Sequence, residues 1–157
     1  MAEHNPQEEI IYRKEVVAKM KPLVEPLTRY LPWLESKKGQ TASSTYGAEG
    51  IAQNSISFPV YDGTLMSFVK DVQRSGLTDR NYVYVYSRNR IRTVEDERKL
   101  IAESELKDMD RLRAVLSRYI LTGQTKGYMW TEAVSNGIFF DVISRMKEVI
   151  EFWDKPM

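Results

Sequence analysis

The sequence contains no cysteine and only one histidine, His4. Without cysteine there is no disulfide, no thiolate nucleophile, no cysteine-ligated zinc and no iron–sulfur cluster. A Ser-His-Asp site needs a positioned imidazole, and His4 lies in a polar amino-terminal stretch that is a poor place for one. A metal site made of several histidines is excluded within one chain. We therefore expect no cofactor, and a protein that works by surface contact more than by bond-making.

Long apolar runs and an excess of charge of one sign are also missing. No apolar stretch reaches the roughly 18 residues of a membrane span, and no apolar run follows a basic start, so no signal peptide is predicted. The formal net charge is +1, which means that electrostatic binding would need a local patch. Because the absence of cysteine fits a reducing compartment, we expect a soluble cytoplasmic protein.

The composition is typical of one folded domain. The chain has 157 residues, of which 42% are hydrophobic and 29% charged, as in globular proteins and unlike disordered ones. No internal repeat and no shift in composition marks a second domain. We expect a flexible amino terminus over residues 1–7 and a single globular domain over residues 8–157.

The last third of the chain carries the clearest helical periodicity. Apolar side chains recur there at spacings of three and four, which places them on one face of each of two helices. Since neither helix is stable alone, we expect them to dock and the rest of the chain to pack on them. Gly123 suits a C-cap with left-handed backbone geometry, and Gly137 a second helix stop. The predicted core positions are Leu106, Met109, Leu112, Val115, Leu116, Tyr119 and Ile120, then Phe139, Val142, Ile143, Met146, Val149, Ile150 and Trp153.

Shorter helices are predicted upstream of this pair, several of them with recognisable caps. Asp62 or Thr64 suits an N-cap, Gly76 a helix end, and Thr93 with Asp96 a capping pair. A loop containing three glycines separates the first helices from the rest. The predicted helices cover residues 8–20, 26–34, 64–74 and 94–103, and the loop covers residues 36–50.

Two segments show the alternation of β-strands. Ser55–Tyr61 places Ile56, Phe58 and Val60 on one side, and Tyr82–Tyr86 alternates tyrosine with valine, both residues of high strand propensity. We predict that these two segments pair as a small antiparallel sheet beside roughly five to seven helices. The expected fold class is therefore α+β, mainly helical.

The most suggestive binding stretch is Tyr82 to Arg92. As a strand it would place three tyrosines on one face, with three arginines continuing their line. These residue types stack on bases and pair with phosphates, and they are also enriched at protein–protein hot spots, although an ordinary edge strand with solvated arginines fits too. An exposed strand edge also favours a homodimer. Lys126 and Tyr128, from the connection after Gly123, complete the set. The candidate binding residues are therefore Tyr82, Tyr84, Tyr86, Arg88, Arg90, Arg92, Lys126 and Tyr128.

Carboxylates offer a catalytic alternative. Asp62 follows a strand-like segment, and Glu97 precedes Lys99 by two, as in nucleases that hold magnesium with a strand-borne Asp and a Glu-x-Lys motif. However, Glu97 and Lys99 fall in a helix-like run, where that motif requires a strand. The simpler interpretation makes Asp62 a cap or turn residue and Glu95–Lys99 a solvated helix start.

Three stretches resemble a family of uncharacterised small bacterial and phage proteins, grouped as a domain of unknown function. The Tyr82–Arg92 stretch and the amino-terminal helix depart from the family pattern. The resemblance implies a small α+β or mostly helical domain and brings no established catalytic residues. The stretches, which together span residues 30–152, are Tyr30-Leu31-Pro32-Trp33-Leu34, Ser57-Phe58-Pro59-Val60-Tyr61-Asp62 with Phe68 and Val69, and Asp108–Leu121 with Gly127, Asn136-Gly137-Ile138 and the final helix.

Missing catalytic groups and an aromatic–arginine stretch together favour a non-enzymatic protein-binding module. With the resemblance, this module fits a phage or mobile-element factor that inhibits or modulates a bacterial protein. Two alternatives stay open: a nucleic-acid-binding protein that uses the aromatic/arginine strand, and a carboxylate- and metal-dependent nuclease.

Overall fold

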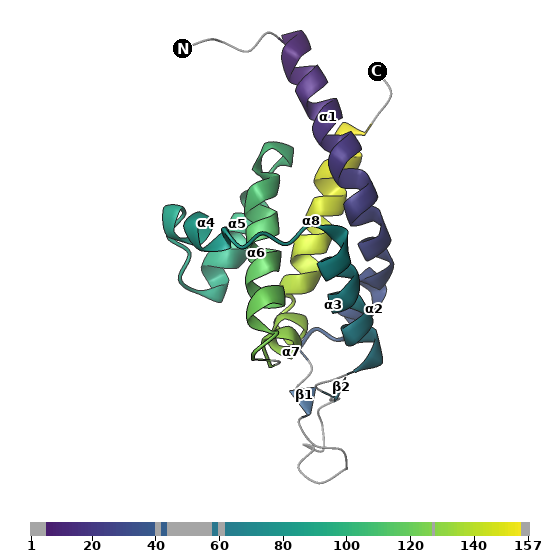
Figure 1. Cartoon of the computed structure of the whole chain (residues 1–157), viewed down its shortest axis with the longest axis vertical. Coiled ribbons are helices and arrows are strands. Elements are labelled where there is room, and N and C mark those ends of the chain that lie inside the picture. The colour runs from purple at the N-terminus through teal and green to yellow at the C-terminus, as the bar shows by residue number, and fades with distance from the viewer. Residues whose placement is uncertain (1–5, 40–41, 44–57, 60–61, 127, 155–157) are drawn as a thin grey trace.

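The described residues of the computed structural model are 6–39, 42–43, 58–59, 62–126 and 128–154. Most of them are helical, and the helices form a bundle (Figure 1). None of the helices in these ranges is long and apolar enough to cross a membrane. The helices are α1 Pro6–Val24, η1 Glu25–Tyr30, α2 Leu31–Ser36, α3 Gly63–Ser75, α4 Tyr82–Arg88, α5 Val94–Glu103, η2 Leu106–Asp108, α6 Met109–Thr122, α7 Tyr128–Ser135 and α8 Ile138–Trp153, where η marks a 3-10 helix.

The expected fold class, α+β with a small antiparallel sheet, is wrong, because the described part of the chain forms an all-α fold. Its only β-structure is a two-residue strand, Ala42–Ser43 (β1), paired in parallel with Phe58–Pro59 (β2). The second expected strand, Tyr82–Tyr86, lies in α4. Of the first expected strand, Ser55–Tyr61, only β2 falls within the described residues.

The alternating Tyr-Val segment is helical because of the surface on which it packs. α4 lies against α6, and a helix brings Tyr82 and Tyr86, four residues apart, to the same side. Their rings meet edge to face with centroids 6.2 Å apart. Strand propensity spans only about 1 kcal/mol per residue, so these contacts outweigh it.

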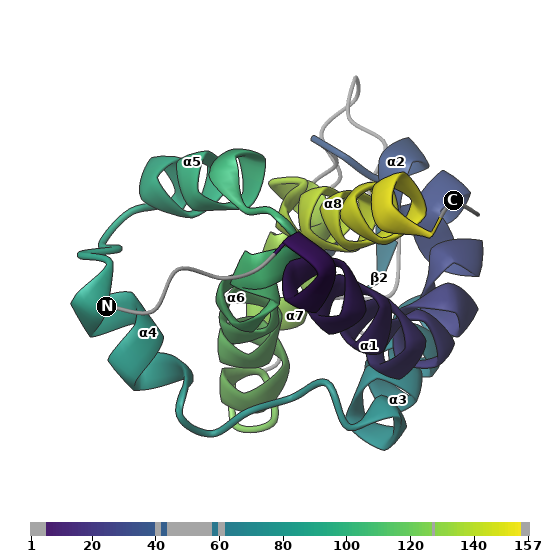
Figure 2. The ribbon, with the colours of Figure 1, turned by 90° about the horizontal axis from the view of Figure 1, so that it is seen from above.

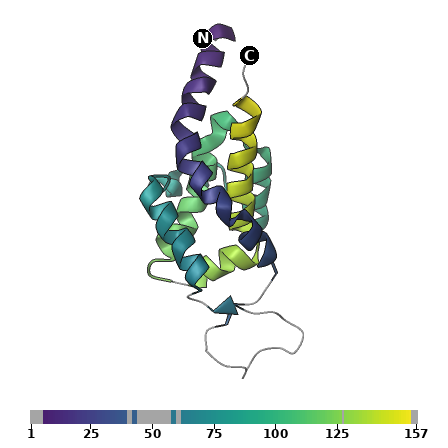
Figure 3. The ribbon, with the colours of Figure 1, turned by 90° about the vertical axis from the view of Figure 1, so that its right-hand side faces the viewer.

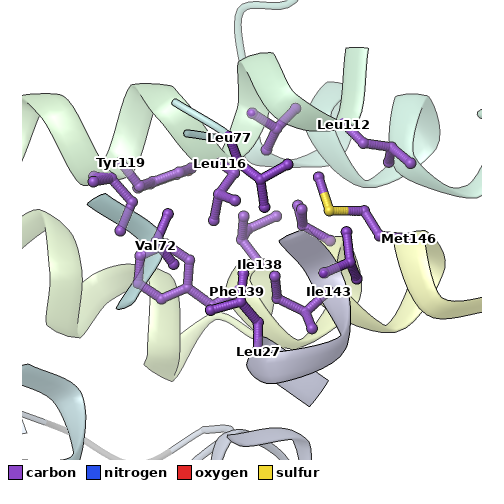
Figure 4. Close-up of a cluster of buried hydrophobic side chains, with 14 of the residues drawn as sticks. Leu27, Val72, Leu77, Leu112, Leu116, Tyr119, Ile138, Phe139, Ile143 and Met146 are labelled. Carbon is purple, nitrogen blue, oxygen red and sulfur yellow. The ribbon is translucent and has the colours of Figure 1, made fainter. Parts of the chain in front are cut away.

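α8 lies at the centre of the bundle, with α5 and α6 on one side and α1 and α2 on the other (Figures 1 and 2). Its predicted inner face is confirmed: Phe139, Val142, Ile143 and Met146 are fully buried. Figure 4 shows Phe139, Ile143 and Met146 converging with side chains of α6, α3 and η1. The exception is Trp153, a predicted core residue that is 36% exposed at the end of the helix.

A chain of aromatic rings links four helices through this core. The ring of Phe68 in α3 lies 5.3 Å from that of Tyr30 and 5.1 Å from that of Phe139 in α8. Phe139 in turn contacts Tyr119 of α6, with centroids 6.1 Å apart. Aromatic pairs of this kind, edge to face or tilted, add about 0.5–1.5 kcal/mol each beyond the area they bury. The periodic helices are thus tied to the amino-terminal half of the chain.

The predicted caps are mostly confirmed. Asp62 Oδ1 accepts hydrogen bonds from the N–H groups of Thr64 and Leu65 and caps α3, and Thr93 with Asp96 forms a capping box on α5. Gly123, expected in the left-handed region, instead has φ −66°. Its backbone is ordinary, and glycine is needed there because the side chain of Trp130 occupies the space that a Cβ would take.

The first helix is longer than expected. α1 continues through Pro22 to Val24, because Met20 and Val24 on either side of the proline are buried against the bundle. At its other end the helix extends beyond α8, so its first turns project from the bundle (Figures 1 and 3).

Candidate binding surface

The approach to α4 is fastened to α6 by polar contacts. Arg113 Nε donates a hydrogen bond to the carbonyl of Leu77 at 3.0 Å, and the N–H of Asp79 donates to Ser117 Oγ at 2.8 Å. Leu77 itself is fully buried. These contacts fix where the helix starts and which side it turns outward.

α4 presents apolar side chains to solvent. None of its seven side chains is fully buried; Tyr84 is 66% exposed and Val83 56% exposed. Tyr82 and Tyr86 occupy the opposite side, toward the bundle. A tyrosine and a valine this exposed on one short helix form an apolar surface that has no packing role in the described residues.

The helix ends in an unusual backbone conformation. The N–H of Ile91 donates to the carbonyl of Tyr86 at 3.0 Å and that of Arg90 to the carbonyl of Ser87 at 3.2 Å, which is the Schellman arrangement. Arg90 lies at the position where glycine is favoured and has φ 55°, the one positive φ found at a non-glycine residue among those described. Holding an L-residue there costs roughly 1–2 kcal/mol.

Positive charge surrounds these exposed side chains. Arg80, Arg88, Arg90 and Arg92 are all exposed, and the sequence from Arg80 to Arg92 contains no carboxylate. None of the four arginines forms an ion pair within the described residues. We call the exposed set Arg80, Val83, Tyr84, Arg88, Arg90 and Arg92 the α4 surface.

A buried carboxylate supports the α4 surface from below. Glu97 of α5 is 1% exposed. Its Oε2 accepts from the Tyr86 hydroxyl at 2.5 Å and from Arg118 Nη1 at 3.2 Å, and its Oε1 accepts from the Tyr119 hydroxyl at 2.6 Å. We call these four residues the Glu97 cluster. It joins α4, α5 and α6 at one point, and it compensates the burial of the carboxylate as buried charges require.

Burial and the negative charge of Glu97 raise the pKa of Tyr86 and Tyr119 well above the usual tyrosine range. Burial is the largest single influence on the Arg118 guanidinium and would lower its pKa, but Glu97, Tyr86 and Tyr119 together outweigh burial and the pKa is raised. Both hydroxyls therefore remain protonated donors at neutral pH, and the guanidinium remains charged. The cluster is a fixed hydrogen-bonded support.

A hollow of about 280 Å³ lies beside the Glu97 cluster. Arg92, Arg118 and Glu132 bring charge to its walls, and Met129 of α7 adds an apolar side. Sites for drug-sized ligands usually enclose about 300–1,000 Å³, so this hollow is small.

The structure divides the predicted site residues among three places. Tyr84, Arg88 and Arg90 are on the α4 surface, whereas Tyr82 and Tyr86 face inward. Arg92 belongs to the surface and also lines the hollow. Lys126 and Tyr128 are exposed in the α6–α7 connection and at the start of α7, and neither lines that hollow.

Sequence reasoning missed the role of Glu97. The predicted solvated helix start is wrong for this residue, since three donors enclose its carboxylate. A signal was present: Glu97 precedes Leu100, Ile101 and Ser104 at spacings of three, four and seven, which is the buried side of α5. A charged residue on an apolar stripe indicates a buried partner.

The two carboxylates of the nuclease alternative have separate structural roles, Asp62 as the cap of α3 and Glu97 in the cluster. Among the described residues, no group of three or more histidine, aspartate or glutamate side chains is placed to hold a metal ion.

No protein-family model, no curated protein and no solved structure matches the chain. The resemblance to a family of uncharacterised bacterial and phage proteins therefore stays a prediction.

Proposed function

We propose that the protein is a binding module whose α4 surface docks onto an acidic patch of a partner protein. The observation that carries this proposal is Arg90, an exposed arginine in a left-handed conformation that would favour glycine. Unfavourable backbone conformations persist where the surrounding structure imposes them, and they cluster at functional sites. The cost of Arg90 to folding is explained if its guanidinium is used in binding.

The composition of the α4 surface suits a protein interface. Tyrosine and arginine are the residue types most enriched at interface hot spots, together with tryptophan. Tyr84 and Arg88 are four residues apart on the helix and share a face, so one partner groove can take both. Four arginines without a carboxylate among them complement an acidic partner and accelerate its association.

The support beneath α4 reduces the entropy lost on binding. Contacts from Arg113 and Ser117 fix the start of the helix, and Tyr86 fixes its end through Glu97. A surface that is already ordered loses less entropy when a partner docks. By occupying the surface of its partner, a module of this kind inhibits or modulates what that partner does.

Site-specific photo-crosslinking in the native host tests the proposal. A photoreactive amino acid replaces Tyr84, and, as the matched control, the similarly exposed Tyr128 of α7. We expect one discrete protein adduct from position 84, none of the same mass from position 128, and loss of the adduct when Arg88 and Arg90 are changed to glutamate.

The purified partner then gives an affinity for comparison. We expect binding to weaken as salt rises and to fall about tenfold or more in the variant Arg90→Gly, which keeps the fold. An adduct that nuclease digestion removes would show nucleic acid in place of protein and overturn the proposal. Equal adducts from positions 84 and 128, or an adduct indifferent to the two charge reversals, would also overturn it.

A further inference from the structure

The outer side of α1 carries a second exposed stripe, on a part of the molecule separate from the α4 surface. The stripe consists of Ile11, Lys14, Glu15 and Ala18. Their spacings of three, one and three residues place them along one side of the helix. All four are exposed, Ile11 to 56%. The buried face of α1, with Val17, is turned toward α8.

The stripe is complementary to itself. When two copies of α1 cross antiparallel, with the two-fold axis between Lys14 and Glu15, Lys14 of each copy faces Glu15 of the other. Ile11 of each copy then faces the small side chain of Ala18. Neither Lys14 nor Glu15 forms an ion pair within the described residues of its own chain. A closed two-fold interface requires this reciprocity, in which each residue meets its counterpart twice.

The surface beside the stripe has room for the larger side chain. A hollow of about 480 Å³ between α1 and the end of α8 is lined by Lys14, Ala18 and Trp153, among others. The ring of Trp153 is held in place by Arg13, whose guanidinium carbon lies 3.6 Å from the ring centroid. Ile11 of a second copy, aligned with Ala18, reaches the mouth of this hollow.

The first turns of α1 project beyond α8 (Figures 1 and 3). Helical turns that pack on no neighbour gain little stability from propensity alone, and a second helix alongside would stabilise them. We propose that the outer stripe of α1 is the interface of a homodimer, in which the α1 helices of two copies pack antiparallel. The contact is small for a protein–protein interface, so the dimer is weak and depends on concentration. This inference does not rest on the binding role of the α4 surface.

Charge swapping tests the pairing. Sedimentation equilibrium from about 1 μM to about 1 mM measures the dimer dissociation constant. Lys14→Glu or Glu15→Lys alone places like charges across the axis twice, and we expect the dissociation constant to rise about tenfold or more. The double variant restores both pairs, and its dissociation constant should return to within about threefold of the original. Both positions are exposed, and a thermal melt confirms that each variant folds.

The absence of cysteine permits a direct geometric test. A copy with Ile11→Cys is mixed with a differently tagged copy with Ala18→Cys, and mild oxidation should join the two. Lys19→Cys, exposed but turned by about 100° from Ala18 around the same helix, replaces Ala18→Cys in the control mixture and should give no comparable cross-link.

Several outcomes would overturn the dimer. One is that the protein stays monomeric at every concentration, which would show that the stripe does not bind a second copy. A dimer indifferent to both charge reversals, or a double variant as weak as the single ones, would show association through another face. Equal cross-linking by the Lys19→Cys control would do the same.

Discussion

The two sides of the bundle are held together by different physics. On the α8 side, α6, α3 and η1 meet through large apolar side chains and aromatic rings, with Phe139 at the centre. On the α4 side, a short helix without a fully buried side chain is held by a hydrogen bond to Ser117, by one from Arg113 and by the Glu97 cluster. Apolar packing is non-directional and tolerant, whereas a buried carboxylate fixes one geometry. The first region supports the fold, and the second orients an exposed surface.

The largest effect should come from the apolar region. Phe139→Ala removes a fully buried ring that contacts Phe68 and Tyr119, and we expect the free energy of unfolding to fall by about 3–5 kcal/mol. Urea denaturation measures it. Phe152→Ala, at an exposed position of the same helix, should change stability by less than about 1 kcal/mol. Similar losses in both variants would contradict the central role of α8.

The Glu97 cluster should give a smaller and more local loss. Glu97→Ala leaves the two tyrosine hydroxyls and the Arg118 guanidinium without their acceptor, at a cost of about 2–4 kcal/mol. Because α4 depends on this acceptor, its amide hydrogens should exchange faster than those of α8. Glu95→Ala, an exposed residue of the same helix, is the control. Uniformly faster exchange throughout the bundle would show that the cluster supports the whole fold instead.

Alkaline pH should distinguish the two regions next. The folded state raises the pKa of Tyr86 and Tyr119, mainly through burial, so each tyrosine contributes stability that is complete below the unfolded pKa of about 10. As pH rises above 10, the unfolded chain loses those protons and the folded chain keeps them, so stability falls by up to about 1.4 kcal/mol per pH unit for each tyrosine. Tyr86→Phe should have a shallower slope in urea melts between pH 9 and 11.5; an unchanged slope would contradict the raised pKa.

The smallest effect concerns the end of α4. Arg90→Gly relieves the left-handed backbone, and thermal melts should show that the free energy of unfolding rises by up to about 1 kcal/mol. Arg88→Gly, two residues earlier within the helix, should lower it by about 0.5–1 kcal/mol. The same substitution thus acts with opposite sign at the two positions. A loss of stability in Arg90→Gly would remove the basis for assigning that arginine to binding.

The α8 region could largely be predicted from the sequence, whereas the α4 region could not. α5, α8 and the caps at Asp62 and Thr93 were predictable, because their signals lie within a few residues and repeat with the period of a helix. α4 was not, since a five-residue alternation of tyrosine and valine fits a strand equally well until its neighbour α6 is known. Over so short an element, periodicity also cannot distinguish a helix from a strand.

The site was harder to predict than the fold. The Glu97 cluster joins residues 11 and 22 positions apart in the chain, and only the packing of α4 and α6 on α5 brings them together. The arginines predicted as binding residues are exposed, but the strand along which they were expected to line up is a helix. The left-handed conformation of Arg90 has no sequence signal, because the residue found there is one that the conformation disfavours.

The corner between α6 and α7 sets a limit on how the chain can vary. The indole N–H of Trp130 donates to the carbonyl of Ile120 at 3.1 Å, and this holds its ring over Gly123, where even one added methyl group would overlap it. A saturation screen should therefore find position 123 as restrictive as the apolar centre, although its backbone angles suit every amino acid. Displacing Trp130 would shift α7 and carry Met129 away from the wall of the hollow beneath Arg92, so a change at the corner would be transmitted to the side of the molecule that bears α4.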